Sequence, residues 1–411
     1  MISEPREVFV WIWLPGETKP LVAGRLASAG TAYLFNYGRS YLNHANAIAI
    51  YEPELPLRQG LLPLLSGLSI PGCLRDASPD AWGRRVILNR KYGGSAPGMD
   101  PAELDELSYL IESGSDRIGA LDFQLSPTVY EPRNASGASL EELTNAVEMV
   151  EQGIPLTDEL ALALQHGTSI GGARPKALLQ GGDRKFIAKF STSSDIYSVV
   201  KAEYVAMRLA ALAGLSVASV SLVQTVDRDV LLVERFDRAA TTCGWQRWSL
   251  VSALTMLTLD EMMARYASYE SLAEVVRVQF VSAPETLREL FSRIVFNILI
   301  GNTDDHARNH AAFWDGRTLS LTPAYDICPQ PRHGRIASQA MLIRQNDRSS
   351  RLSTCLTAAP QFLISEESAA EIIIRQVECI TQNWSVICEE ASLSEVDRKL
   401  LWGNQVLNPF A

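Results

Sequence analysis

The sequence predicts an α+β fold, in which β-rich segments come first and a mainly helical part follows. Residues 7–51 contain short apolar runs separated by Pro, Gly and Asn, a pattern typical of strands and turns. Two further β-rich runs flank a glycine-rich turn, and the periodicity from about residue 247 onward is helical. We therefore expect a β-rich subdomain over residues 1–135, a small lobe over 136–240 and a helical large lobe over 241–411.

Composition limits the class of protein. The 411 residues include 47% hydrophobic residues and carry a formal net charge of −10, which fits a globular chain and argues against a broad nucleic-acid-binding surface. The six cysteines form no CxxC pair, so we expect neither a zinc site nor a disulfide framework. No apolar run is long enough to span a membrane, and the N-terminus lacks the pattern of a signal peptide. We expect a cytoplasmic protein without membrane contact.

Turn and cap signals place the elements of the first part. We expect strands over "EVFVWIW" (7–13), "LVAGRLA" (21–27), "TAYLFNYG" (31–38) and "ANAIAIY" (45–51). Ser78 at the N-cap and Pro79 at N1 would begin a helix that ends at a Gly-Gly pair, and residues 101–114 predict another. After a Gly-, Ser- and Pro-rich boundary, Ser139 and Glu142 predict a capping box for the next helix.

The middle of the chain predicts a hairpin, a helix and two more strands. The turn Gly181-Gly182-Asp183-Arg184 lies between "KALLQ" and "KFIAKF", as expected of a β-hairpin. An amphipathic helix is expected over residues 198–215, followed by strands within 216–226 and 229–237.

The decapeptide "GNTDDHARNH", residues 301–310, follows the apolar run "FSRIVFNILI" and is dense in polar groups. Polar groups at a core boundary are costly unless they are paired or bind a ligand. One interpretation is a metal site, with His306 and His310 on one helical face; no glutamate is placed to act as in HExxH. A second is a capped helix start or a solvated polar loop.

A third interpretation rests on the spacing from Asp304 to Asn309, which is that of a protein-kinase catalytic loop. In such a loop the Asp accepts the proton of the attacking hydroxyl and the Asn amide oxygen holds Mg²⁺. A second carboxylate is expected downstream, and Asp326 in "AYDI" follows an apparent hairpin.

The upstream parts of such a site also have candidates. Lys189 is the one charge inside "FIAKF", suitable for an ATP phosphate, although an edge-strand lysine facing water would give the same pattern. Gly171 and Gly172 in "SIGGARPK" would let backbone N–H groups approach phosphate oxygens. The strand "LLVERFDR" ends at Glu234–Phe236, where a backbone hinge could bind adenine.

Taken in order, "SIGGARPKALL", "FIAKF", "LLVERFDR", "GNTDDHARNH" and "AYDI" resemble the motifs of the HipA family. Its members are bacterial serine/threonine kinases that act as the toxin of a toxin–antitoxin pair. "ASPDAWGRR" and "GSDRIGALDF" in the N-terminal part are similar to that family too, so the resemblance spans nearly the whole chain. It implies a two-lobed, protein-kinase-like fold with an N-terminal β-rich subdomain.

The resemblance also implies roles for single residues. Asp304 would be the catalytic base and His306 its structural support, while Asn309 and Asp326 would hold Mg²⁺. ATP would contact the phosphate loop, the strand lysine and the hinge: Ile170, Gly171, Gly172, Ala173, Arg174, Lys176, Lys189, Glu234, Arg235 and Phe236. Ser169 would be the site of inactivating autophosphorylation, although it could equally be an ordinary turn serine. Glu203 could pair with Lys189.

The implied partners are a HipB-like helix-turn-helix antitoxin, DNA only through that antitoxin, and a protein substrate such as an aminoacyl-tRNA synthetase. Two departures from the family pattern are Asp305, where a small residue is common, and Arg174-Pro175 in the phosphate loop. The extra carboxylate of Asp305 could alter metal affinity. A small-molecule or lipid kinase and a nucleotide-binding regulatory subunit are alternative functions.

Overall fold

The structure is a computed structural model that describes residues 5–93, 100, 104–133, 138–165, 174–192, 195–225, 228–332 and 334–411. The chain divides into two compact units. Unit 1 comprises residues 1–190, 224–251 and 313–317, and unit 2 comprises residues 191–223, 252–312 and 318–411. Within the described ranges, no helix is both long and apolar enough to cross a membrane.

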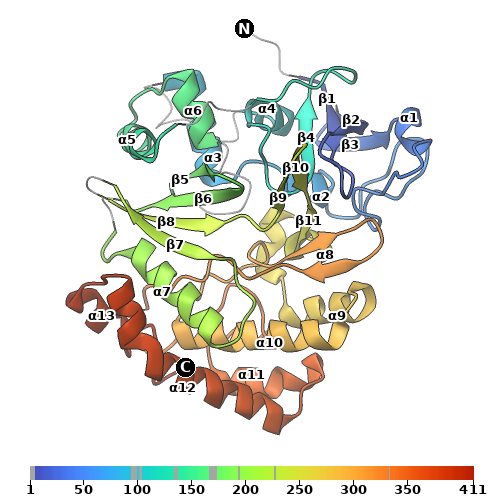
Figure 1. The fold of residues 1–411 in the computed structure, drawn as a ribbon. Coiled ribbons are helices and arrows are strands. Elements are labelled where there is room, and N and C mark those ends of the chain that lie inside the picture. The colour runs from blue at the N-terminus through green and yellow to red at the C-terminus, as the bar shows by residue number, and fades with distance from the viewer. Residues whose placement is uncertain are drawn as a thin grey trace. The chain divides into compact units, whose positions relative to one another are not determined.

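An antiparallel sheet with the order β3-β2-β1-β4 forms the first part of unit 1 (Figure 1). Its strands are β1 (Glu7–Ile12), β2 (Leu21–Ala29), β3 (Ala32–Tyr37) and β4 (Leu121–Gln124). Alternate residues of β1 point into the core, where Val8, Val10 and Ile12 are fully buried. The three predicted strands at residues 7–13, 21–27 and 31–38 are thus confirmed.

The strand expected over "ANAIAIY" (45–51) is wrong, because these residues form turns and irregular chain. Their backbone is bonded to side chains instead of to another strand. The Tyr37 hydroxyl accepts from the Ile50 N–H (2.9 Å), and the Tyr41 hydroxyl donates to the Ile48 carbonyl (2.7 Å). The alternation of apolar residues therefore reflects burial of a loop and not strand pairing.

Short helices connect and cover the sheets of unit 1: α1 (Arg39–Leu42), α2 (Gly72–Arg75), α3 (Ala81–Tyr92), α4 (Glu106–Glu112), α5 (Leu140–Glu151) and α6 (Asp158–Gln165). The expected start of α3 is wrong, since Asp80, and not Ser78, is its N-cap and accepts from the Gly83 N–H. The capping box of Ser139 and Glu142 is confirmed at the start of α5.

A second antiparallel set of strands in unit 1 carries the hairpin predicted from the glycine-rich turn. β5 (Lys176–Gly181) pairs with β6 (Arg184–Phe190), and β6 pairs on its other side with β8 (Asp229–Glu234). Helix α6 contacts β5, α3 and α5. A separate hairpin, β9 (Arg238–Thr241) and β10 (Gly244–Arg247), follows β8.

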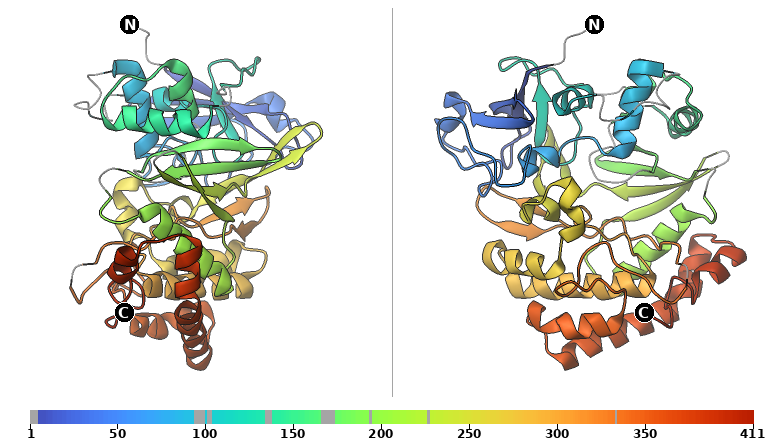
Figure 2. Two further views of the ribbon diagram at one scale, coloured as in Figure 1. Left: turned by 60° about the vertical axis from the view of Figure 1, so that its left-hand side comes forward. Right: turned by 180° about the vertical axis from the view of Figure 1, so that it is seen from behind.

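Unit 2 is mainly helical, as predicted for the C-terminal part, and Figure 2 shows its helices in colours from green to red. They are α7 (Val199–Leu212), α8 (Ala253–Met256), η3 (Glu261–Tyr266), α9 (Tyr269–Gln279), α10 (Ala283–Ile300), α11 (Leu352–Ala358), η4 (Ala359–Phe362), α12 (Glu366–Glu390) and α13 (Glu395–Leu401). β13 (Leu319–Leu321) belongs to this unit, while β7 (Val220–Gln224), β11 (Ser249–Ser252) and β12 (Ala311–Trp314) include a unit boundary.

Helix α10 is the central helix of unit 2 and contacts α9, α11, α12 and η4. Leu287, Leu290, Phe291, Ile294 and Ile298 recur at the spacing of one helical face and are buried. This helix leads directly into the decapeptide, so its packing fixes where the polar residues begin.

Candidate active site

The decapeptide is a loop that begins at the left-handed C-cap of α10. Gly301 has φ 76°, and a Cβ at this position would lie 2.6 Å from the Gln405 carbonyl oxygen, so only glycine fits. The residues that follow form no helix. Both helical interpretations of the decapeptide, a metal-binding face and a capped helix start, are therefore wrong.

Asp305 anchors this loop to the core. Its carboxylate is buried and accepts hydrogen bonds from the Tyr269 hydroxyl and from Asn297 Nδ2 (2.7 Å), and it lies 3.0 Å from His310 Nε2. Burial by itself would raise the pKa of Asp305, but His310 and the hydrogen bonds outweigh it and lower that pKa. The carboxylate that departs from the family pattern is thus committed to holding the loop.

The neighbouring Asp304 differs from Asp305 in both exposure and the direction of its pKa shift. Its side chain is exposed, yet the protein around the carboxyl removes enough water to raise its pKa. The charge of His306 opposes this shift, and the negative charges of Asp326 and Asp305 add to it. Asp304 and Asp326, separated by 22 positions in the sequence, therefore lie close enough for their carboxylates to interact.

Asn309 is held by the same loop. It is buried, its N–H donates to the His306 carbonyl (2.8 Å), and its Nδ2 donates to the Asp304 carbonyl (3.3 Å). Among the described residues, the side-chain hydrogen bond of Asn309 uses Nδ2 and not Oδ1. The amide is therefore oriented with its oxygen available to a ligand. His306 Nδ1 is buried, without a partner in the described part of the chain.

Asp326 follows β13 and has a left-handed backbone, with φ 60°. Such a conformation is uncommon for a residue with a side chain and is concentrated at functional sites. The neighbouring Tyr325 hydroxyl donates to the Arg308 carbonyl (2.7 Å), which ties this strand end to the decapeptide. The structure thus brings Asp304, Asn309 and Asp326 into one region of unit 2.

The donor set of this region suits magnesium. A carboxylate and an amide oxygen are hard oxygen ligands, and Mg²⁺ in phosphoryl-transfer sites commonly takes one or two carboxylates and completes its shell with water and phosphate. Among the described residues, no group of three or more His, Cys, Asp or Glu side chains is arranged to bind a metal. The described residues therefore offer no site in which protein groups alone surround a metal. Asn309 and Asp326 fit a site in which water and phosphate oxygens supply the remaining ligands.

The residues proposed for the phosphate loop lie partly outside the described ranges: Ser169, Ile170, Gly171, Gly172 and Ala173. Arg174 is half-buried. Lys176 is buried and forms an ion pair with Asp80, whose other oxygen caps α3. This pair connects the motif "ASPDAWGRR" to β5, a contact that the sequence did not predict.

Lys189 is half-buried in β6, where its register partners are Lys176 and Leu231. Because β6 lies between β5 and β8, the edge-strand interpretation of this lysine is wrong. The role of Lys189 as a phosphate contact stays a prediction. Glu203, its suggested partner, is buried on α7 in unit 2.

The proposed adenine hinge continues from the end of β8. Glu234 is the last residue of the strand, and Phe236 packs edge-on against Phe313 at 5.8 Å between ring centroids. Arg235 is buried, and its backbone N–H donates to the Lys185 carbonyl (2.8 Å). The Arg235 N–H is therefore committed to the sheet, and the adenine contact of this segment stays a prediction.

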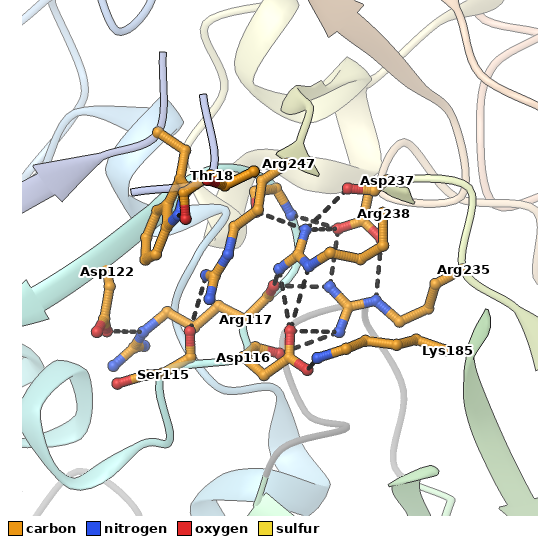
Figure 3. Close-up of polar contacts among 12 residues, drawn as sticks. Thr18, Ser115, Asp116, Arg117, Asp122, Lys185, Arg235, Asp237, Arg238 and Arg247 are labelled. Carbon is orange, nitrogen blue, oxygen red and sulfur yellow. Dashed lines mark hydrogen bonds and ion pairs between the residues drawn. The ribbon is translucent and has the colours of Figure 1, made fainter. Parts of the chain in front are cut away.

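The Arg235 side chain belongs to a buried charge network that we call the Asp116 cluster: Asp116, Lys185, Arg235, Asp237 and Arg238 (Figure 3). Asp116 accepts from all three cations, and Asp237 accepts from both arginines and from the Gly119 N–H (2.8 Å). Burial would raise the pKa of Asp116, but Arg235, Arg238 and Lys185 lower it well below its usual range.

The Asp116 cluster explains the second N-terminal motif. "GSDRIGALDF" supplies Asp116, and the Arg117 carbonyl accepts from Arg235 Nη2 (2.8 Å). The motif thereby fixes the hinge end of β8 and, through Lys185, the strand that carries Lys189. The residues that this motif contacts are distant from it in the sequence. The motif can therefore be recognised in the sequence, but its contacts cannot be predicted from it.

Comparison of the fold with solved structures gives a match over almost the whole chain. The complex of HipA, HipB and operator DNA from the toxin–antitoxin system of Shewanella oneidensis MR-1 contains a chain that superposes with a TM-score of 0.67. The match covers 96% of this chain and 95% of that one, with 16% sequence identity. It confirms the predicted HipA-like α+β fold.

Sequence comparisons define the family. Residues 13–124 match the HipA N-terminal domain and residues 168–384 match the HipA-like C-terminal domain. This chain belongs to the HipA family, which the sequence motifs predicted.

Among its relatives, a provisionally named kinase, Y4mE of Sinorhizobium fredii, is 27% identical over 321 residues, 71% of each chain. The serine/threonine-protein kinase toxin HipA of Shewanella oneidensis is 29% identical over 189 residues, covering 39% of this chain and 42% of that one.

Proposed function

We propose that this HipA-family chain is a kinase that transfers the γ-phosphoryl group of ATP to a serine or threonine of a protein, with Mg²⁺ as cofactor. The observation that carries the proposal is the group formed by exposed Asp304, Asn309, whose Nδ2 donates to the Asp304 carbonyl, and Asp326 in a left-handed backbone. Like-charged carboxylates at a surface are costly to bring together unless a cation or a reaction uses them.

In this proposal Asp304 accepts the proton of the attacking hydroxyl. A raised pKa makes its carboxylate a stronger base toward that proton. Asp305 positions it by fixing the loop, and His306 supports it. Asn309 Oδ1 and Asp326 would hold Mg²⁺, which when bound neutralises the charge of the phosphates.

The ATP contacts of the proposal belong to unit 1. Lys189 would bind the phosphates, and the backbone of Glu234 and Phe236 would contact adenine. The glycine loop, from Ile170 to Arg174, would place N–H groups near the phosphate oxygens. We assign the phosphate contact to Lys189 and not to Lys176, because a contact from Lys176 would break its buried pair with Asp80.

The substrate and partners follow from the family. We propose a translation component, such as an aminoacyl-tRNA synthetase, as the target, which would place the reaction in the cytoplasm. The solved complex with the matching fold contains HipB and operator DNA, which supports a HipB-like antitoxin as partner and DNA contact through it. The test is incubation of the purified protein with labelled ATP and either lysate proteins or a metabolite extract. Label in serine or threonine of a protein supports the proposal, whereas label confined to small molecules or lipids contradicts it.

We also propose that Ser169 is autophosphorylated and that this inactivates the enzyme. A phosphate there would add roughly −1.5 to −2 charges beside the ATP phosphates and compete for Lys189. Mass spectrometry of protein incubated with Mg-ATP should find slow modification of Ser169 that depends on Asp304, with activity falling as it accumulates. Phosphate only elsewhere in the chain, or full activity of protein modified at Ser169, would contradict this switch.

A further inference from the structure

A basic segment connects Asp326 to α11. Residues 330–351, which we call the arginine segment, contain five arginines (Arg332, Arg335, Arg344, Arg348 and Arg351) and one acidic residue, Asp347. The chain as a whole has 37 basic and 47 acidic residues, so this balance is reversed locally. A concentration of positive charge on an acidic protein calls for a specific explanation.

Backbone hydrogen bonds hold the arginine segment beside the catalytic loop. The Gln330 N–H donates to the Gly301 carbonyl (2.9 Å), and the Ala340 N–H donates to the Thr303 carbonyl (3.0 Å). Thr303 directly precedes Asp304. Farther along, the Leu342 N–H donates to the Ala267 carbonyl (2.9 Å). The backbone of the arginine segment is therefore held beside the loop that carries Asp304.

The charges in this segment lack matching carboxylates. Arg332 Nη2 donates to the Arg335 carbonyl (2.9 Å), and Arg332 Nε is buried without a partner among the described residues. Burial and the neighbouring charge of Arg351 lower the pKa of Arg332. In the described ranges, no carboxylate lies at ion-pair distance from any of the five arginines. A buried guanidinium N–H without a partner is costly, and a bound anion would remove that cost.

Asp347, the acidic residue of the segment, does not form an ion pair with these arginines. Its carboxylate accepts from the Ser349 N–H (2.7 Å) and the Thr354 hydroxyl (3.2 Å), so it stabilises the turn before α11. Its charge acts on Arg351 but forms no ion pair with it. The pair of Arg332 and Arg351 therefore presents two like charges that an external carboxylate could bridge.

We infer that the arginine segment is a docking surface for acidic residues of the protein substrate that flank the phosphoacceptor serine or threonine, with Arg332 and Arg351 as specificity-determining residues. This inference rests on the proposed kinase function and adds the class of substrate to it. Guanidinium groups bind carboxylates in a bidentate fashion, so acidic flanks would orient the hydroxyl toward Asp304 as well as add affinity.

The test measures peptide binding without requiring phosphoryl transfer. A fluorescent peptide with a serine between glutamates and a matched peptide with glutamines are titrated with the full chain carrying Asp304→Asn. We expect the glutamate peptide to bind at least about tenfold more tightly, and its affinity to fall as salt is raised from about 0.05 to 0.5 M. Adding Arg332→Gln and Arg351→Gln should remove this preference.

The matched control removes two exposed arginines elsewhere in unit 2, Arg288→Gln and Arg375→Gln, and should retain the preference. Equal affinity for both peptides, or an equal loss in the control, would overturn the inference. Because the assay contains no ATP, its result does not depend on phosphoryl transfer, and the labelled-ATP test of the kinase proposal can fail independently of it. In the active enzyme, loss of both arginines should raise the KM for dephosphorylated casein and leave kcat nearly unchanged; the reverse pattern would contradict docking.

Discussion

The Asp116 cluster of unit 1 and the Asp304–Asp326 pair of unit 2 both bring carboxylates together, but they balance the charge differently. In the Asp116 cluster, two carboxylates are interleaved with three cations, all in ion pairs, and the pKa of Asp116 is lowered. In the second region, loss of water around the Asp304 carboxyl and the neighbouring charge of Asp326 raise the pKa of Asp304.

The difference separates a structural network from a candidate site. A buried carboxylate surrounded by cations is stable as it stands, and removing it leaves charges without partners. Two neighbouring carboxylates repel each other, and a cation bound at a functional site relieves that repulsion. Substitutions should therefore have opposite effects on stability in the two regions.

The largest effect should come from Asp326→Asn, which removes a carboxylate from the proposed metal site. Asparagine tolerates the left-handed backbone that Asp326 adopts, so the fold should be retained. We expect phosphoryl transfer to fall by two or more orders of magnitude and ATP affinity to become nearly independent of Mg²⁺. Titration of ATP with and without Mg²⁺ checks this, with Asp183→Asn in the β5–β6 turn as a control. An unchanged dependence on magnesium would remove Asp326 from the site.

The second-largest effect, a loss of stability, should come from Asp116→Asn. This substitution leaves Lys185, Arg235 and Arg238 without their shared carboxylate. Breaking a buried ion pair by removing one partner costs about 3–5 kcal/mol. We expect a clear drop in the melting temperature of the protein by calorimetry. The exposed Asp183→Asn, in the same unit, should change it little. If both variants melt like the wild type, the cluster does not stabilise the fold.

The smallest effect concerns the stability of Asp304→Asn. A pKa that is raised in the folded state means that the ionised carboxylate opposes folding above that pKa, whereas well below the unfolded pKa of about 3.9 the group is protonated in both states and has no effect. The variant should thus melt at the same or a slightly higher temperature than the wild type near pH 7, and any difference should shrink as the pH is lowered toward about 3. A lower melting temperature at neutral pH would show that Asp304 stabilises the fold.

The sequence predicts the fold class and most elements because these depend on local patterns. The glycine-rich turn between β5 and β6 and the capping box of α5 need only neighbouring residues. The loop at 45–51 was misassigned because its backbone is satisfied by tyrosine hydroxyls from β3 and α1. Such contacts have no local signature.

For the candidate site, too, the sequence predicts some features and not others. The spacing of Asp304 and Asn309 and the position of Asp326 are visible in the sequence, although their roles are still predictions. The inward orientation of Asp305 was not visible, since Tyr269, one of its partners, lies 36 positions away. Asp116 and Arg235 are 119 positions apart, so only the fold reveals their pairing.

The most direct test of the central claim is phosphoryl transfer by Asp304→Asn, measured together with ATP binding. The substitution removes the proposed base and leaves the proposed phosphate and metal contacts in place. The account predicts that transfer to protein serine or threonine falls by about 10²- to 10⁴-fold while the Kd for Mg-ATP changes little. Transfer at the wild-type rate by a folded Asp304→Asn variant would contradict it.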